Sequence, residues 1–231
     1  MQFTRISLTV VALFCMTGPT WAAVIPCSPP PGFRDTPHPM IAPPDELVSH
    51  TEEIVIDRPL LAVSEAMNKP LNQALRGTDS LPGVSGDFML TKGAFGAPGS
   101  RHIVCLTDGG SVEEEALERE QSTRSGHFKY IVWNYQTPKG RPIAYGIGEF
   151  HSEQIDDSHT RVSWTYSFSL RPDTFPGDLC AFGRFLFRVG FLDRDYAAMM
   201  RGVLNGYKTA AEQAPKESAV ATQNPERRNL L

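Results

Sequence analysis

The sequence predicts an α+β fold in which a curved, seven-stranded antiparallel sheet wraps around a long C-terminal helix, with two short helices after the first strand. Residues 100–170 alternate apolar and polar side chains over five successive segments that are separated by turn-forming residues. Residues 182–207 carry apolar side chains every three or four positions, which is the spacing of one helix face. Because the sequence offers no other large element to cover the sheet, we expect this helix to pack on it.

The first elements of the fold are short. Residues 49–57 alternate apolar and polar side chains and predict a strand. Pro59 suits the start of a helix, and the apolar spacing after it predicts a helix through Met67. A second short helix is predicted over residues 71–76, and a strand through Phe88 follows it.

The rest of the sheet is predicted as a series of hairpins. Asp108-Gly109 is a strong turn signal between two alternating segments. The C-terminal helix contains Gly190, where we expect a kink. The five segments predicted as strands are 100–107, 111–121, 128–135, 142–155 and 161–170.

Composition excludes one class of partner. Of the 231 residues, 41% are hydrophobic and 21% are charged, which is typical of globular proteins. The formal net charge is −4. Binding to phosphates requires clustered Lys and Arg side chains, so we expect no nucleic-acid partner.

The first residues resemble a secretory signal peptide. Arg5 is the only charge before an apolar run over residues 6–16, and small residues precede the expected cleavage after Ala22. The run is about half of the ~20 residues that a membrane-spanning helix needs, although a short anchor is the alternative. We therefore expect residues 1–22 to be a signal peptide and the mature chain to be periplasmic or secreted.

Three further regions follow the signal. Residues 23–47 are rich in proline and predict an extended, semi-rigid linker, because proline cannot donate to a helix or sheet. Residues 48–214 carry the predicted strands and helices and form the expected ligand-binding domain. Residues 215–231 have no apolar periodicity, and we expect a disordered tail.

Removal of the signal leaves Cys27, Cys105 and Cys180. An odd number in an oxidising compartment leaves at least one thiol free or paired between molecules. Cys105 lies in an alternating strand and is interpreted as a core thiol. A pair between Cys27 and Cys180 is the alternative, which their separation in sequence does not decide.

Several short motifs in order resemble those of the START-like superfamily, also called SRPBCC. They are Gly99 to Ile103, the turn Asp108-Gly109, Glu115 to Leu117, the strand around Tyr130, and Val162 to Trp164. This superfamily includes plant hormone receptors, pollen allergens, lipid-transfer domains and polyketide cyclases/dehydrases, and the resemblance covers nearly all of residues 48–214. It implies the helix-grip fold, with an apolar cavity under the long helix.

The resemblance also implies which side chains face this cavity. Aromatic side chains suit such a role because they combine apolar area with a hydrogen-bonding group, although all of them could be ordinary core residues. The expected ligand-binding residues are Arg101, Ile103, Glu115, Leu117, Phe128, Tyr130, Tyr145, Trp164, Tyr166, Tyr196, Met199 and Val203.

Arg101 and Glu115 form the most specific pair in this set. If both face an apolar cavity they must pair, since an isolated buried charge is costly. The pair could anchor a ligand carboxylate or hydroxyl, or it could be a structural ion pair or two solvated strand ends.

No metal, cofactor or catalytic residue is predicted. The histidines at positions 102, 127 and 159 and the His151-x-Glu153 pair fall on different strands and on both faces, with no spacing that brings three ligands together. The glycine-rich loop over residues 93–99 precedes a strand and is expected to act as a gate over the cavity.

Three functions are compatible with these features. The favoured one is binding or transport of a hydrophobic small molecule or lipid without catalysis. The second is a cyclase/dehydratase-like enzyme in which Arg101 and Glu115 polarise a carbonyl and move a proton. The third is a cell-envelope interaction, with peripheral membrane contact through the aromatic segment 182–192 and its Arg184 and Arg188.

Overall fold

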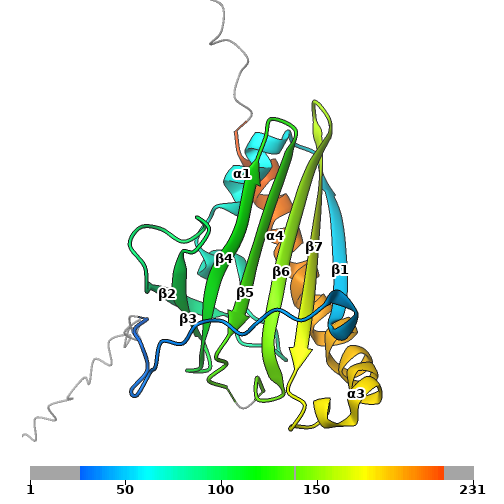
Figure 1. The fold of residues 1–231 in the computed structure, drawn as a ribbon. Coiled ribbons are helices and arrows are strands. Elements are labelled where there is room, and N and C mark those ends of the chain that lie inside the picture. The colour runs from blue at the N-terminus through cyan, green and yellow to red at the C-terminus, as the bar shows by residue number, and fades with distance from the viewer. Residues whose placement is uncertain (1–26, 138, 216–231) are drawn as a thin grey trace, which may run out of the picture.

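The computed structural model describes residues 27–137 and 139–215 and contains one antiparallel sheet (Figure 1). Its strand order is β1-β7-β6-β5-β4-β3-β2, so the strands from β2 to β7 form a meander and β1 closes the far edge beside β7. The predicted sheet of seven strands is confirmed. The strands are β1 Val48–Ile56, β2 Val84–Met89, β3 Arg101–Leu106, β4 Ser111–Gln121, β5 Ser125–Trp133, β6 Ile143–Asp156 and β7 His159–Leu170.

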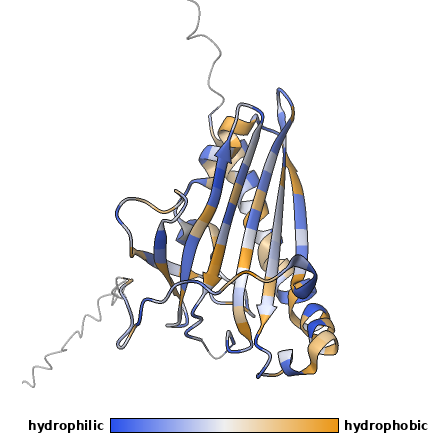
Figure 2. Cartoon of the chain, in the orientation of Figure 1, coloured by the Kyte–Doolittle hydropathy of each residue, from blue (hydrophilic) through white to orange (hydrophobic). Residues whose placement is uncertain are grey.

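The alternating pattern determines how the strands are buried. In β7, every second residue from Thr160 to Phe168 is buried, and the residues between are partly or fully exposed. Figure 2 shows hydrophilic and hydrophobic residues interleaved along the strands. One face of the sheet therefore forms the main core with the C-terminal helix.

The long C-terminal helix is built from three consecutive segments. These are α3 Cys180–Phe187, the π-helical η3 Arg188–Tyr196 and α4 Ala197–Gln213. The backbone stays in the right-handed helical region at both junctions, at Arg188 and at Ala197. Around Gly190, where a kink is expected, the helix is widened into a π-helical stretch.

The remaining helices are short. They are the 3-10 turns η1 Pro44–Glu46 and η2 Gly177–Leu179, and the helices α1 Leu60–Met67 and α2 Leu71–Ala74. α1 buries Leu60, Val63 and Ala66, whose spacing of three places them on one face, and it packs against α4. Among the described residues, no helix is long and apolar enough to cross a membrane.

Residues 27–47 lie against the sheet face opposite α4, and we call this segment the strap. It forms no strand, as its prolines predict, but it crosses the sheet instead of extending away from the domain (Figure 1). The indole Nε1 of Trp133 donates to the carbonyl of Thr36 at 3.2 Å, and the amide of Ala42 donates to the Tyr145 hydroxyl at 2.7 Å. The strap therefore covers apolar side chains on the outer face, where Ile131, Trp133, Tyr145 and Ile147 form a second buried cluster.

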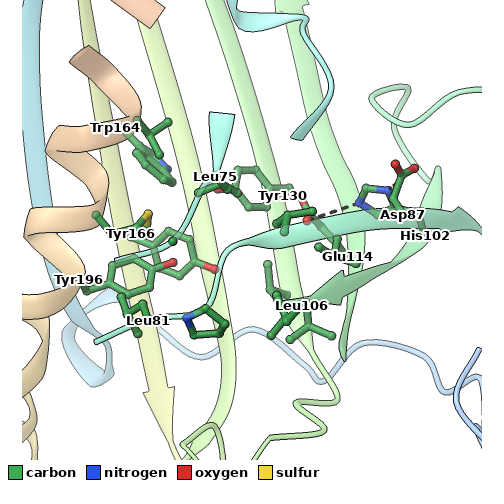
Figure 3. A pocket seen from close by; sticks show the side chains of 18 of the residues that line it. Leu75, Leu81, Asp87, His102, Leu106, Glu114, Tyr130, Trp164, Tyr166 and Tyr196 are labelled. Carbon is green, nitrogen blue, oxygen red and sulfur yellow. Dashed lines mark hydrogen bonds and ion pairs between the residues drawn. The ribbon is translucent and has the colours of Figure 1, made fainter. Parts of the chain in front are cut away.

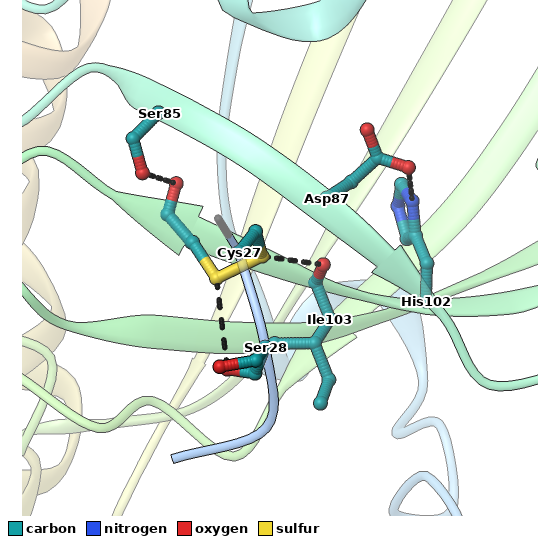
Figure 4. Close-up of a disulfide and its surroundings, with 7 residues drawn as sticks. Cys27, Ser28, Ser85, Asp87, His102 and Ile103 are labelled. Atoms are coloured by element: carbon teal, nitrogen blue, oxygen red, sulfur yellow. Dashed lines mark hydrogen bonds and ion pairs between the residues drawn. A yellow bond between two sulfur atoms is a disulfide. The ribbon is translucent and has the colours of Figure 1, made fainter. Parts of the chain in front are cut away.

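A disulfide between Cys27 and Cys105 joins the strap to β3 (Figure 4). The interpretation of Cys105 as a core thiol is wrong, and so is the alternative pairing of Cys27 with Cys180. Within the described part of the chain, Cys180 is the free cysteine, and it is exposed. The expected signal peptide and the tail beyond Pro215 lie outside the described residues.

Candidate functional site

A cavity of about 430 Å³ lies between the sheet and the helices. Its walls come from the inner face of β2–β7, from α1 and the segment after it, from the loop over residues 93–99, and from η3 and α4. Its lining is mostly apolar and rich in aromatic side chains. Pockets of about 300–1,000 Å³ with such a lining are typical sites for small molecules.

The structure brings together most of the aromatic and helical residues that the sequence predicts for this site. Tyr130, Trp164, Tyr166 and Tyr196 surround the same space (Figure 3). Tyr130, Trp164 and Tyr166 are at alternating positions of strands, so their side chains share the inner face of the sheet, and Tyr196 lies on the side of the helix that faces the cavity. The predicted residues that line the cavity are Phe128, Tyr130, Trp164, Tyr166, Tyr196, Met199 and Val203.

The other predicted residues do not line the cavity. The alternation groups them correctly, but the face that the resemblance implies for these groups is wrong. The strap covers the outer face, so this face carries apolar side chains as well. Two sheet faces that are both covered give no polar face by which to orient a strand. The residues on the outer side are Arg101, Ile103, Glu115, Leu117 and Tyr145.

Arg101 fixes the strap instead of anchoring a ligand. Its Nη2 donates to Glu113 Oε2 at 2.7 Å and to the carbonyl of Thr36 at 2.9 Å, and it also pairs with Asp35. Glu115 is more distant, with its Oε2 3.7 Å from Arg101 Nε. The predicted pair therefore exists as part of a structural ion-pair network on the outer face.

Five tyrosine side chains line the cavity. Burial raises their pKa values well above 10, and that of Tyr207 to about 12. The hydroxyls therefore stay neutral at physiological pH and can both donate and accept hydrogen bonds. The five are Tyr130, Tyr135, Tyr166, Tyr196 and Tyr207.

Three of the polar atoms in the lining are buried without a hydrogen bond in the described structure. His102 Nε2 is one, and the Tyr135 hydroxyl and the Trp164 Nε1 are the other two, both of them donors. The sequence pattern missed Tyr135, because the strand ends at Trp133 and Asn134 has φ 52°, which breaks the alternation. Both donors are free to bind an acceptor atom of a ligand.

Two glycines in β6 make room for the tyrosine rings. A Cβ at Gly146 would lie 3.0 Å from the hydroxyl oxygens of both Tyr135 and Tyr166. A Cβ at Gly148 would lie 2.1 Å from Cζ of Tyr130. The absence of side chains here lets the rings lie directly on the β6 backbone.

One end of the cavity is polar. His102 on β3 lies between Glu114 on β4 and Asp87 on β2 (Figure 3). Its Nε2 is 3.4 Å from Glu114 Oε2, and its Nδ1 is 3.4 Å from Asp87 Oδ2. Phe95, from the loop expected as a gate, stacks on the imidazole with ring centroids 3.8 Å apart.

Burial alone would lower the pKa of His102, but Glu114 and Asp87 outweigh it and raise that pKa above 6.5. His102 and Glu114 are direct cross-strand partners. The sequence pattern missed Glu114 because the neighbouring Glu115 of the run Glu113-Glu114-Glu115 was assigned to the cavity face. Alternation within this run places its middle member on the opposite side from the other two.

Comparison with solved structures identifies the architecture. Ara h 8.0201 superposes with a TM-score of 0.50 at 11% identity, covering 72% of this chain and 98% of that one. The Zhui aromatase/cyclase from Streptomyces has a TM-score of 0.50 at 14% identity, covering 75% and 98%. Norcoclaurine synthase from Thalictrum flavum, in complex with dopamine and hydroxybenzaldehyde, has a TM-score of 0.50 at 7% identity, covering 80% and 100%.

The chain has the START-like, or SRPBCC, helix-grip fold. The resemblance inferred from the sequence motifs is thereby confirmed for the fold. No family model and no curated protein matches the sequence. Because the identities are low, the likeness to these structures concerns the fold alone.

Among the described residues, one group of side chains could hold a metal ion, and it lies on the outer face of the sheet. Potential ligand atoms of His127, Glu149 and His151 all lie within 4.8 Å of one another. His127 and His151 are cross-strand partners on β5 and β6, so the expectation that the histidines stay apart is wrong for this pair. Glu149 Oε1 lies 2.8 Å from His127 Nε2 and 3.3 Å from His151 Nε2. Two imidazoles and a carboxylate are a donor set that suits divalent transition metals.

Proposed function

We propose that this protein binds a hydrophobic small molecule in the cavity of its helix-grip fold. The observation that carries the proposal is the cavity of about 430 Å³, lined by aromatic side chains and by two unpaired donors. Tyr130, Phe150 and Trp164 present broad ring surfaces, with Phe150 and Trp164 stacked at 4.7 Å between centroids. Such a lining suits a compact ligand that contains a ring.

The unpaired donors define the polar part of this ligand. A buried donor without a partner costs about 1–3 kcal/mol, and a ligand oxygen near Tyr135 or Trp164 would remove that cost. We therefore propose a ligand with a carbonyl, ether or hydroxyl oxygen on an apolar frame. Norcoclaurine synthase, which shares this fold, is in complex with the aromatic molecules dopamine and hydroxybenzaldehyde, and this supports an aromatic ligand class.

The cyclase-like alternative cannot use Arg101 and Glu115 in the way expected from the sequence. Both lie on the outer face of the sheet beside the strap, so neither contacts a molecule in the cavity. The Zhui aromatase/cyclase shows that this fold hosts enzymes. Any acid–base chemistry in this chain would have to use other residues.

We also propose that the protein is exported and that it contacts a membrane surface. The disulfide between Cys27 and Cys105 supports export, because disulfides persist in oxidising compartments.

On α3, Phe182 and Phe185 are 60% and 57% exposed, whereas Phe187 is buried. Exposed aromatic rings beside arginine side chains favour contact with an anionic membrane surface. Replacing both exposed phenylalanines by serine should abolish binding to anionic vesicles, and Leu61→Ser, at an exposed site on α1, should not.

Ligand binding is tested by purification from the native compartment followed by native mass spectrometry. We expect an additional mass that disappears when the chain is unfolded. The variant Trp164→Ala should lower the retained fraction, and Tyr145→Phe, on the outer face, should leave it unchanged. Equal retention in both variants would contradict binding in this cavity.

A further inference from the structure

Glu114 and His102 are ionisable side chains at the edge of an otherwise apolar cavity. His102 is 1% exposed and Glu114 is 7% exposed. Removing a charge from water costs several kcal/mol unless a partner compensates. Packing alone would favour apolar residues at both positions, so their presence points to a chemical role.

The three groups form a path from the cavity to solvent. Glu114, His102 and Asp87 all line the cavity, the imidazole lies between the two carboxylates, and the Asp87 side chain is 45% exposed. Each imidazole nitrogen faces one carboxylate at 3.4 Å. An imidazole can accept a proton at one nitrogen and release one from the other. The arrangement can therefore pass protons between a buried carboxylate and an exposed one.

Phe95 isolates the centre of this path. Its ring stacks on His102 with an interplanar angle of 5°. Phe95, Glu114 and His102 all line the cavity. Water is thus kept from one face of the imidazole, which strengthens the electrostatic coupling between the three groups.

We propose that Glu114 is a general acid–base catalyst for a molecule bound in the cavity, and that His102 and Asp87 relay its proton to and from solvent. This inference rests on the proposed function, because it requires an apolar ligand in the cavity. Glu114 is the group that touches the substrate, and His102 and Asp87 act through it.

The substrate class follows from the groups that share the cavity. Glu114 takes a proton from a carbon next to a carbonyl, and the electron pair of that C–H bond forms the carbon–carbon double bond of an enolate. The carbonyl oxygen then carries the negative charge, and the donors of Tyr135 and Trp164 can stabilise it. If the substrate is a β,γ-unsaturated carbonyl compound, the enolate is conjugated, and return of the proton from Glu114 to the γ carbon moves the double bond and gives an isomer, so the step needs no further reactant. We infer a hydrophobic carbonyl compound as the substrate.

The test uses 5-nitrobenzisoxazole, a small apolar probe that reports on a base in a cavity. The base removes the proton from its ring carbon, the C–H electrons form a nitrile, the N–O bond breaks, and a coloured phenolate is released. We expect the wild-type chain to turn over the probe and Glu114→Gln to lose about 100-fold or more of that rate. Glu115→Gln is the matched control, since its side chain lies on the outer face, and it should keep the wild-type rate.

The relay has its own measurement. Asp87 contributes to the raised pKa of His102, so Asp87→Asn should move both the pH profile of turnover and the NMR titration of His102 to lower pH. A purely structural role for Asp87 would lower stability without moving the pH profile. Circular dichroism of each variant checks that it folds.

The outcomes separate the two proposals. Saturable binding of the probe by calorimetry without turnover would contradict catalysis by Glu114 and leave the proposed function intact. Equal turnover by wild type and Glu114→Gln would also contradict it. Absence of probe binding would contradict the proposed function, and the relay with it.

Discussion

Glu114 and Glu115 are neighbours in β4, but their side chains lie on opposite sides of the sheet. Glu114 lines the cavity beside His102, and Glu115 lies 3.7 Å from Arg101 on the side of the strap. The same chemical group therefore has two environments one residue apart. Comparing Glu114→Gln with Glu115→Gln therefore separates the effect of losing a carboxylate in the cavity from the effect of losing one negative charge.

Tyr135→Phe should weaken ligand binding without weakening the fold. Among the described residues its hydroxyl makes no hydrogen bond, so removing it should cost the empty protein little. If a ligand oxygen accepts a hydrogen bond from that hydroxyl, the variant should lose about 0.5–1.5 kcal/mol of binding free energy, which corresponds to about 2- to 10-fold weaker affinity. Calorimetry with the identified ligand measures this change. Lower thermal stability with unchanged affinity would show that the hydroxyl serves the fold.

Gly148→Ala should damage both the cavity and the fold. The new Cβ would lie 2.1 Å from Tyr130 Cζ, so the ring must move into the cavity. We expect a loss of about 1–3 kcal/mol in the free energy of unfolding together with weaker binding. Gly202→Ala in α4 is the control, since its Cβ would meet nothing within 4 Å. The free energy of unfolding of Gly202→Ala should rise by about 0.5–1 kcal/mol. Denaturant titration measures the free energy of unfolding of both variants. An unchanged value for Gly148→Ala would contradict the account.

Loss of the disulfide should loosen the strap and leave the cavity working. Cys27→Ser combined with Cys105→Ser removes the link between strap and β3. We expect the free energy of unfolding to fall by about 2–4 kcal/mol and residues of the strap to become sensitive to protease. Ligand affinity should remain, because the strap lies on the outer face. A large loss of affinity at a temperature where the variant is folded would show that strap and cavity are coupled.

His102 should make stability depend on pH. Glu114 and Asp87 raise its pKa in the folded state above 6.5 against the effect of burial. The folded state therefore binds the proton more tightly than the unfolded state does. The stabilisation is complete below about pH 6.5 and is lost as the pH rises through the folded-state pKa. The difference in unfolding free energy between wild type and His102→Gln should shrink over this range. A difference that grows with pH would mean that His102 is neutral in the fold.

The sequence predicted the elements well because local patterns determine them. The alternation in β7 and the three- and four-residue spacing from Met199 to Tyr207 are each carried by neighbouring residues. The first part of the predicted helix stripe is wrong, because Phe182, Phe185 and Val189 are exposed and the π-helical segment changes the spacing. The turn at Asp108-Gly109 also has a local cause, since Gly109 has φ 84°. Features of this kind need no knowledge of distant segments.

The face of β3 and β4 could not be predicted in the same way. Whether the face of β3 that carries Arg101 and Ile103 points into the cavity or away from it depends on where the strap packs. The proline-rich sequence of the strap does not indicate this position. The disulfide that fixes the strap joins residues 78 positions apart, and sequence spacing does not specify such a pair. Glu114 and His102 were missed for the same reason, because their pairing across β3 and β4 depends on this choice of face.

The central claim is that the space enclosed by sheet and helix binds an apolar molecule. Calorimetric titration with 1-naphthol, a ring compound with one hydroxyl, tests it most directly in wild type and in Val203→Trp, which places a large side chain where Val203 lines the cavity. We predict saturable binding of one molecule per wild-type chain and none to Val203→Trp. No saturable binding to the wild type, or equal binding to both chains, would contradict the account.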